Sequence, residues 1–351
     1  MALNWAFGRT IPLRRLVWAG ENEFHLESGL ATPIPSKDSF LLRVRAVGIC
    51  GTDIHILRGE LPGVRPPRVL GHEIAGEVHA IGEGITRFKV GDRVTVDSVV
   101  GCGNCGFCSR GRQQFCRSGY EFGVSHDGGC QDFLLVPEAN AFHISPNISF
   151  EEGAILDMEV FSALKRCGVR EGDVALVAGD GPAGLIACQL LRHMGASKVL
   201  LSGQSPGRMR TAGRLELADR VIDSRCNSVP SIVASETAGI GVDISVDCAG
   251  TEDSANDAIR SVAAGGSVLL YGVYSKPLVH FDLNQIVLRD LKVFGALSDR
   301  LGWESVIDLV ESRKLELSSL ITHRFPLEEA QLAFESVQAR TDGLVKAVFL
   351  L

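Results

Sequence analysis

Residues 174–184 read VALVAGDGPAG, an apolar run that leads into three glycines spaced as G-x-G-x-x-G. The apolar run predicts a buried strand, and PAGLIACQLLRHMG predicts the helix that follows it. In such a turn the first glycine allows the bend, the second lets the backbone approach a pyrophosphate, and the third lets the helix pack close to the strand. The helix N-terminus then faces the phosphates. The stretch predicts a dinucleotide site at Gly179, Gly181, Pro182, Ala183 and Gly184; a glycine-rich turn without a ligand is the alternative.

The segments after Asp173 alternate between apolar strands and amphipathic helices. KVLLSG, DRVID, VDISVDCAG and GGSVLLYG predict strands, and RMRTAGRLELA and SANDAIRSVAA predict helices between them. Repeated β-α-β units build a parallel, doubly wound sheet with helices on both faces. This α/β context strengthens the dinucleotide interpretation, because the glycines then lie where a strand of such a sheet passes into a helix.

The end of the strand KVLLSG bears on the choice between NAD and NADP. An NAD-preferring site usually has Asp or Glu here, accepting from the ribose hydroxyls, but this chain has Ser202 and Gly203. Without a carboxylate there is no repulsion against a 2′-phosphate, and Ser205 and Arg208 could bind one. The pattern favours NADP over NAD. The alternative is that Arg208 and Arg210 are solvated helix residues.

The chain before Ile148 reads differently, as short strands separated by glycine and proline. Segments such as SFLLRVRAVGI and EIAGEVHAIGEGI predict an antiparallel or barrel-like domain. Ser149, followed by two glutamates, is a predicted N-cap that opens a helix through Lys165. From Leu297 the pattern is mixed, with a helix near WESVIDLVES and a final strand KAVFLL. We expect this tail to fold back onto the first domain.

Four cysteines lie within residues 101–116, GCGNCGFCSRGRQQFC, in the pattern C-x2-C-x2-C-x7-C. Two-residue gaps let neighbouring thiolates point into one space, and a fourth thiolate completes a tetrahedron, which is the geometry of a structural zinc site. Free thiols, two disulfides and an iron–sulfur cluster are the alternatives. The predicted ligands are Cys102, Cys105, Cys108 and Cys116.

Length and charge exclude several classes of protein. The chain has 351 residues, enough for two domains, and a formal net charge of −7, which disfavours a nucleic-acid partner and a zinc-finger module. We predict no membrane span and no signal peptide, because no apolar run is long enough and the N-terminus has early charges. A cytoplasmic location, where thiols stay reduced, suits cysteines that bind metal.

A second group of metal-binding residue types precedes the four cysteines. Cys50 lies in GICGTDIH, and His72 and Glu73 lie in LGHE. Together with the four-cysteine segment and the dinucleotide fold that follows, this ordered combination resembles the zinc-dependent medium-chain dehydrogenases, the alcohol, polyol and threonine dehydrogenase group. The resemblance covers essentially the whole chain. It implies a GroES-like, mostly β catalytic domain over residues 1–157 and 297–351, and a Rossmann domain that binds NAD(P) over residues 158–296.

The resemblance also implies roles for particular residues. Cys50 and His72 would bind a catalytic zinc, Glu73 would bind directly or through water, and Asp157 takes the position of a further glutamate ligand, with Glu159 as a substitute. The chain would then hold two Zn²⁺ ions, one structural and one catalytic. Thr52 matches the family's proton-relay residue, and His55 would carry the proton onward or be a core histidine. Further predicted cofactor contacts are Ala249, Tyr271, Gly272, Leu297 and Lys346, the last near the pyrophosphate.

The activity implied is the interconversion of a secondary alcohol and its ketone by hydride transfer, with a polyol, sugar or cyclitol as substrate. The alternatives are amino-alcohol oxidation like that of threonine 3-dehydrogenase, and a catalytically silent protein that binds NADPH. No membrane or nucleic-acid partner is expected. GGSVLLYGVY and LKVFGAL would form an exposed sheet edge, which in this family joins subunits, so we predict a homodimer or homotetramer.

Overall fold

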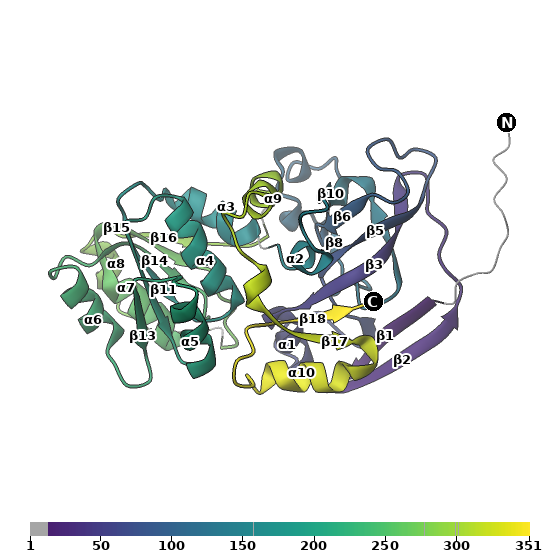
Figure 1. Ribbon diagram of the computed structural model, residues 1–351. Coiled ribbons are helices and arrows are strands. Elements are labelled where there is room, and N and C mark those ends of the chain that lie inside the picture. Colours follow the sequence, from purple (N-terminus) through teal and green to yellow (C-terminus); the bar gives the residue numbers. More distant parts are fainter. Residues whose placement is uncertain (1–12, 157, 277, 299, 301) are drawn as a thin grey trace.

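The computed structural model describes residues 13–156, 158–276, 278–298, 300 and 302–351. Two parts lie side by side in Figure 1, a mostly β part and a part built on a parallel sheet. In the described residues, the larger β sheet has the order β10-β6-β5-β3-β18-β17, with β9 beside β3. Its strands are β3 (Ser39–Ile49), β5 (Glu73–Ile81), β6 (Arg93–Val96), β9 (Phe133–Pro137), β10 (Ala141–His143), β17 (Ile321–Pro326) and β18 (Lys346–Leu350).

Two small sheets and several short helices complete the β part. One sheet joins β1 (Leu13–Gly20), β2 (Glu23–Leu30) and β4 (Arg68–Val69), and the other joins β7 (Val99–Val100) and β8 (Tyr120–Glu121). Helix α1 (Gly51–Leu57) is separated from the end of β3 by one residue and was not predicted from the sequence. The 3-10 helices of the chain are η1 (Cys108–Arg110), η2 (Gln113–Phe115), η3 (Glu138–Asn140), η4 (Ser318–Leu320) and η5 (Leu327–Glu329).

The second part confirms the predicted doubly wound sheet. Its strands are all parallel and follow the order β13-β12-β11-β14-β15-β16. They are β11 (Val174–Ala178), β12 (Lys198–Gly203), β13 (Arg220–Asp223), β14 (Val242–Asp247), β15 (Val262–Leu270) and β16 (Lys292–Gly295). The helices between them are α4 (Pro182–His193), α5 (Pro206–Arg214), α6 (Val229–Glu236), α7 (Glu252–Ser261) and α8 (Asn284–Val287). The sequence analysis missed α6.

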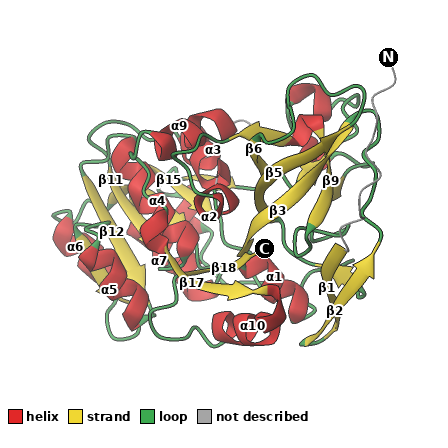
Figure 2. Ribbon diagram, turned by 45° about the vertical axis from the view of Figure 1, so that its right-hand side comes forward, coloured by secondary structure: helices red, strands yellow, loops and turns green. Residues whose placement is uncertain are grey.

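Side chains of β11 alternate between the two faces of this sheet. Ala175 and Val177 pack with Leu185 of α4, whereas Leu176 packs with Val233 of α6 and with α7. Because successive side chains of a strand point to opposite faces, a strand that is apolar at every position needs cover on both sides. Figure 2 shows β11 and β12 among these helices.

The segment after β10 forms two helices, which corrects the prediction of one continuous helix through Lys165. Ser149 is the N-cap of α2 (Phe150–Ala154), as predicted, and its hydroxyl accepts from the backbone N–H of Glu152. Helix α2 ends where the backbone of Ile155 leaves the helical region (ψ 17°). It packs on β3 and β5, whereas α3 (Met158–Cys167) packs on α4 and β15. Packing on two different sheets therefore divides a sequence that reads as one helix.

The C-terminal segment returns to the β part, as predicted. It contains α9 (Trp303–Glu311) and α10 (Ala330–Gln338), the latter missed by the sequence analysis, and ends in β18, which lies between β3 and β17. Figure 1 shows this segment in yellow along the β part. One buried cluster joins Ala46 of β3 and Ala75 of β5 to Val177 of β11, so the two parts share a core.

Burial should strengthen an ion pair, and a comparison of two neighbouring glutamates of α2 can measure this effect. Glu152 is buried and accepts hydrogen bonds from Ser149 and from Arg313 Nη1 at 2.6 Å, whereas Glu151 pairs with Arg324 at a more exposed position. We expect Glu152→Gln to lower the free energy of unfolding by about 1–3 kcal/mol, because charge-assisted hydrogen bonds to a buried group are lost. Glu151→Gln, the matched control, should cost less than about 1 kcal/mol. Urea unfolding measures both, and equal losses would contradict the role of burial.

Candidate active site and metal centres

Three residues from two segments converge at the carboxyl end of β3. Cys50 follows β3 and is the N-cap of α1, His72 lies between β4 and β5, and Glu73 begins β5. A thiolate sulfur, an imidazole nitrogen and a carboxylate oxygen of these residues all lie within 4.8 Å of one another. This donor set is one that a zinc ion binds.

The backbone makes room for this cluster at two glycines. Gly71 has φ +90°, and a Cβ there would lie 2.6 Å from Val47 and 2.8 Å from the sulfur of Cys130, so only glycine fits before His72. Gly48 lies opposite Glu73 in the antiparallel pair of β3 and β5, and a Cβ on Gly48 would lie 1.8 Å from Glu73 Oε2. The carboxylate of Glu73 therefore occupies the space above Gly48.

Two buried charged residues surround the cluster. Asp53, in the first turn of α1, accepts from the backbone N–H of Cys50 at 2.8 Å and lies 3.5 Å from His72 Nδ1. Lys346, the first residue of β18, donates to Glu73 Oε1 at 2.6 Å. Burial alone would lower the pKa of His72, but Asp53 and Cys50 raise it well above its ordinary value.

The charges of this site fit a divalent cation. With Cys50 as a thiolate, three acidic groups and the ammonium of Lys346 leave an excess of two negative charges when His72 is neutral. Among the described residues, Glu73 Oε2, His72 Nδ1 and Asp53 Oδ1 are buried without a hydrogen-bond partner. Buried charges need a counter-charge, and a zinc ion bound to Cys50, His72 and Glu73 would supply it.

Two further positions, Asp157 and Glu159, were predicted as possible ligands of the catalytic zinc. Asp157 lies outside the described residues. Glu159, the substitute, lines the same cavity, and its Oε1 accepts from the hydroxyl of Ser298 at 2.6 Å.

The four-cysteine segment folds into a small lobe between β7 and β8. The sulfurs of Cys102, Cys105, Cys108 and Cys116 all lie within 4.8 Å of one another, with Cys102 and Cys108 4.0 Å apart and Cys105 and Cys116 3.9 Å apart. Four sulfurs around a zinc ion at ~2.3 Å lie roughly 3.8 Å apart. The spacing therefore fits a tetrahedral metal site.

Backbone donors point at these sulfurs. The N–H of Cys108 donates to Cys105 and that of Cys102 donates to Cys116. Backbone hydrogen bonds from Cys108 and Phe107 lower the pKa of Cys105 to about 6, whereas desolvation raises the pKa of Cys108 to about 11. Hydrogen bonds to thiolate ligands of this kind support a bound metal.

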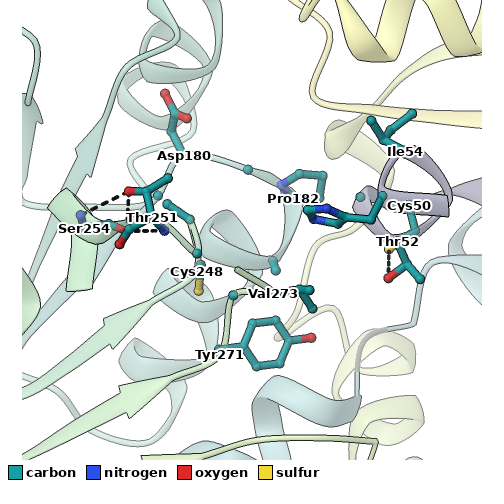
Figure 3. Close-up of a pocket in the computed structure, with 18 of the residues that line it drawn as sticks. Cys50, Thr52, Ile54, Asp180, Pro182, Cys248, Thr251, Ser254, Tyr271 and Val273 are labelled. Carbon is teal, nitrogen blue, oxygen red and sulfur yellow. Dashed lines mark hydrogen bonds between the residues drawn. The ribbon is translucent and has the colours of Figure 1, made fainter. Parts of the chain in front are cut away.

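One cavity of about 1250 Å³ runs between the two parts of the chain. It reaches the predicted catalytic residues Cys50, Thr52, His55, His72 and Glu73. It is also lined by most predicted cofactor contacts, namely Gly179, Gly181, Pro182, Ala183, Ser202, Gly203, Arg208, Ala249, Tyr271, Gly272, Leu297 and Lys346. Figure 3 shows Cys50 and Thr52 on one wall and Asp180, Cys248 and Tyr271 on the other. Hence a single space connects the two predicted sites.

Thr52 and His55 lie on α1 beside the metal cluster. The Thr52 hydroxyl oxygen is 3.8 Å from the sulfur of Cys50, and His55 Nδ1 is 2.5 Å from Glu60 Oε2. Both residues line the cavity, so a proton on Thr52 could pass toward the His55–Glu60 pair. The pairing of His55 with Glu60 was not predicted.

The glycine turn has the form expected of a dinucleotide site. Gly181 is the N-cap of α4, and Pro182 occupies the first turn of that helix. A Cβ on Gly184 would lie 1.9 Å from the carbonyl oxygen of Gly179, so the helix can approach the strand only with glycine there. Lys346, expected near the pyrophosphate, lines the same cavity, and its ammonium donates to Glu73.

The predicted 2′-phosphate ligands are engaged elsewhere. Arg210 forms two 2.8 Å hydrogen bonds with Asp342, and Arg208 Nε donates to the carbonyl of Leu344. The backbone N–H of Ser205 donates to Asp180 at 2.7 Å. The NADP preference therefore stays a prediction, without support from these contacts.

The acidic residues of the cavity wall that were not predicted from the sequence include Asp97, Glu121 and Asp180. Asp97 is buried and accepts from Gln113 Nε2 at 2.7 Å, which ties the four-cysteine lobe to the cavity. Burial raises the pKa of Glu121. Asp180 was visible between two motif glycines, but nothing in the motif indicates where its side chain points.

Comparisons with known proteins agree with this geometry. Residues 36–146 match the alcohol dehydrogenase GroES-like domain, and residues 182–312 match the zinc-binding dehydrogenase domain. An L-threonine 3-dehydrogenase of Pectobacterium carotovorum is 30% identical over 322 residues, covering 90% of this chain and 92% of that protein. A sorbitol dehydrogenase of Halalkalibacterium halodurans is 28% identical over 312 residues, covering 88% and 90%.

A solved structure shares the whole architecture. A proposed zinc-binding dehydrogenase of Sinorhizobium meliloti 1021, bound to NADP, superimposes with a TM-score of 0.90 at 29% identity, covering 97% of this chain and 99% of that one. In the described part of this chain, no helix is long and apolar enough to cross a membrane.

Asp97 gives a prediction for the pH dependence of stability. Burial raises its pKa to about 6, above an unfolded value of ~3.9. Between these values the folded chain keeps a proton that the unfolded chain has released, so this group's contribution to stability falls as pH rises from about 4 to 6. We expect Asp97→Asn to gain stability relative to the wild type over that interval, by at most about 3 kcal/mol, measured by urea unfolding at several pH values.

The control for Asp97 is Asp219. Although burial opposes it, hydrogen bonds from Val199 and Arg192 hold the pKa of Asp219 below its ordinary value. The contribution of Asp219 to stability is fully present above the pKa of the unfolded state and is lost as the pH falls through the lower pKa of the folded state. The stability of Asp219→Asn relative to the wild type should therefore change with pH in the opposite direction. A pH-independent difference for Asp97→Asn would show that Asp97 titrates normally.

Proposed function

This chain belongs to the zinc-dependent medium-chain dehydrogenase family, and on that premise we propose that it interconverts a secondary alcohol and its ketone by hydride transfer. The observation that carries the proposal is the single cavity that reaches both the Cys50, His72 and Glu73 cluster and the glycine turn. A substrate held at the cluster would then face a nicotinamide held along the other wall. The proposed domain division is residues 1–157 with 297–351, and residues 158–296.

The roles of the residues follow from their places in the cavity. Bound zinc would lower the pKa of the substrate hydroxyl, and bound NAD(P) would accept the hydride. Cys50, His72 and Glu73 would hold the metal, and Asp53 would orient the ring of His72. Lys346 would hold the carboxylate of Glu73 in place through its hydrogen bond to Oε1.

The proton of the substrate hydroxyl needs a route out of the site. We place Thr52 first on this route, since its hydroxyl lies beside the sulfur of Cys50 and can both accept and donate a proton. His55 follows, one helical turn further along α1, and the carboxylate of Glu60, which contacts its Nδ1, would hold the ring in place. Asp53 is committed to Cys50 and His72 and takes no part in the transfer.

The substrate class is a polyol, sugar or cyclitol, in line with the name of the sorbitol dehydrogenase relative. A specific observation favours a second candidate, an amino alcohol such as threonine. Glu121 lies on the cavity wall close enough to His72 to interact electrostatically with it, and burial raises its pKa. An ammonium group on the substrate would stabilise the ionised carboxylate of Glu121.

The assembly is proposed as a homodimer or homotetramer. Strand β16 is an edge of the parallel sheet, and the side chains of Val287 at the end of α8, Leu288 just after it and Val293 on β16 are exposed. An apolar sheet edge of this kind is usually covered by another chain. A cytoplasmic location is part of the same proposal, because thiols that bind metal need a reducing compartment.

Metal content tests the proposal directly. We expect two zinc ions per wild-type chain by plasma mass spectrometry, and one in Cys50→Ser and in Cys105→Ser. Only Cys105→Ser should lower the melting temperature markedly, because a structural zinc contributes folding energy, whereas Cys50→Ser should abolish alcohol oxidation. One zinc in the wild type, unchanged in Cys50→Ser, would favour a silent protein that binds NAD(P).

The proton route can be tested separately from metal binding. We expect Thr52→Val to lower kcat about 10²–10⁴-fold without loss of zinc, because the first proton acceptor is removed. Thr52→Ser, which keeps the hydroxyl, is the matched control and should stay near wild-type activity. Steady-state kinetics on an accepted polyol measures both variants. A Thr52→Val enzyme as active as Thr52→Ser would remove Thr52 from the route.

A further inference from the structure

The end of β12 has no acidic residue of its own, yet a carboxylate lies there. Gly203 is the last residue of β12, where a side chain that reads the adenosine ribose usually stands. A Cβ built on Gly203 would lie 2.4 Å from Asp180 Oδ2, 2.7 Å from its Cγ and 2.6 Å from its Cβ. Asp180, from the glycine turn after β11, thus fills the space that a side chain at position 203 would take.

Backbone donors hold this carboxylate in place. Asp180 Oδ2 accepts from the N–H of Gln204 at 3.0 Å and from that of Ser205 at 2.7 Å, and the side chain is buried. Free N–H groups at this point, just before α5, would be good donors to a phosphate. Because Asp180 already accepts from both of these N–H groups, its own carboxylate occupies the position at which a 2′-phosphate would find hydrogen-bond donors.

Of the basic residues nearby, Arg208 and Arg225 interact electrostatically with Asp180, but neither forms an ion pair with it in the described part of the chain. Arg210 is paired with Asp342, and Arg208 Nε is bonded to Leu344. Arg208 Nη1 lies 4.0 Å from a Cβ built on Gly181, so the guanidinium faces the glycine turn. A guanidinium at that position suits the pyrophosphate, and because NAD and NADP share the pyrophosphate, this contact would not distinguish the two nucleotides.

We propose that Asp180 is the residue that selects the nucleotide, and that it makes the chain prefer NAD(H) to NADP(H); this rests on the proposed dehydrogenase function. Its buried carboxylate accepts from the ribose hydroxyls and repels a 2′-phosphate. NAD-preferring sites usually have this carboxylate at the end of the strand, whereas here it belongs to Asp180 of the glycine turn. Gly203 is then required, because a side chain there would collide with Asp180.

Nucleotide affinity, independent of turnover, tests this proposal. NADH and NADPH are titrated separately into the zinc-loaded protein, and Kd is obtained by calorimetry for the wild type and Asp180→Asn. We expect the wild type to bind NADH at least tenfold more tightly than NADPH. Asp180→Asn should shift the ratio of the two Kd values toward NADPH by tenfold or more, mainly by tighter NADPH binding.

Two further variants separate selection from structure. Asp308→Asn removes the same charge at an exposed position of α9 away from the cavity and should leave the ratio unchanged. The double variant Asp180→Ala with Gly203→Asp moves the carboxylate to the strand end and should restore the NADH preference. Melting temperatures confirm that each variant is folded.

The opposite results are equally clear. A wild type that prefers NADPH, or an Asp180→Asn variant that weakens both nucleotides alike, would overturn the proposal and leave Asp180 as a cap of the turn before α5. A wild type that binds neither nucleotide would overturn the proposed function as well, whereas binding of NADPH alone would leave the dehydrogenase function standing.

Discussion

The group of buried charges at the carboxyl end of β3 is the constraint on which the rest of the structure depends. Cys50, Asp53 and Glu73 bring acidic groups into one small space next to His72, and such groups are costly to bury without a counter-charge. Lys346 supplies one positive charge from the end of the chain. Lys346 begins β18, which pairs with β3, so the C-terminal segment that follows the parallel sheet brings this ammonium back to Glu73.

The two ends of the cavity use the same steric device. At the metal end, Glu73 lies in the space left open by Gly48 on the neighbouring strand, and at the nucleotide end, Asp180 lies in the space left open by Gly203. In both places a missing Cβ admits a carboxylate from another segment. Each carboxylate is then held by a fixed donor, the ammonium of Lys346 or the backbone N–H groups before α5. Glycine therefore has two roles here: it allows turns, and its missing Cβ leaves space for a carboxylate from another segment.

Local patterns predicted the parts of the molecule in which one segment is sufficient. The strand and helix periodicity between residues 173 and 270 gave the parallel sheet, and the two-residue gaps between cysteines brought four sulfurs together. The N-cap at Ser149 was also correct. The same patterns failed where packing decides, since α2 and α3 read as one helix but pack on different sheets. Helix α10 was missed entirely, and the contact of Lys346 with Glu73 was not predicted.

The sequence by itself determined the family, the α/β architecture, and the residue types of the candidate metal and nucleotide sites, because these depend on short-range spacing that can be recognised without knowledge of the fold. Only the tertiary structure decided which charges meet. Lys346 is 273 positions from Glu73 and Asp180 is 24 positions from Gln204, and no local pattern records such pairs. Their contacts depend on strand order and on the direction of each side chain, which are set when the sheets pack together, and it is these contacts that give the cavity its charge.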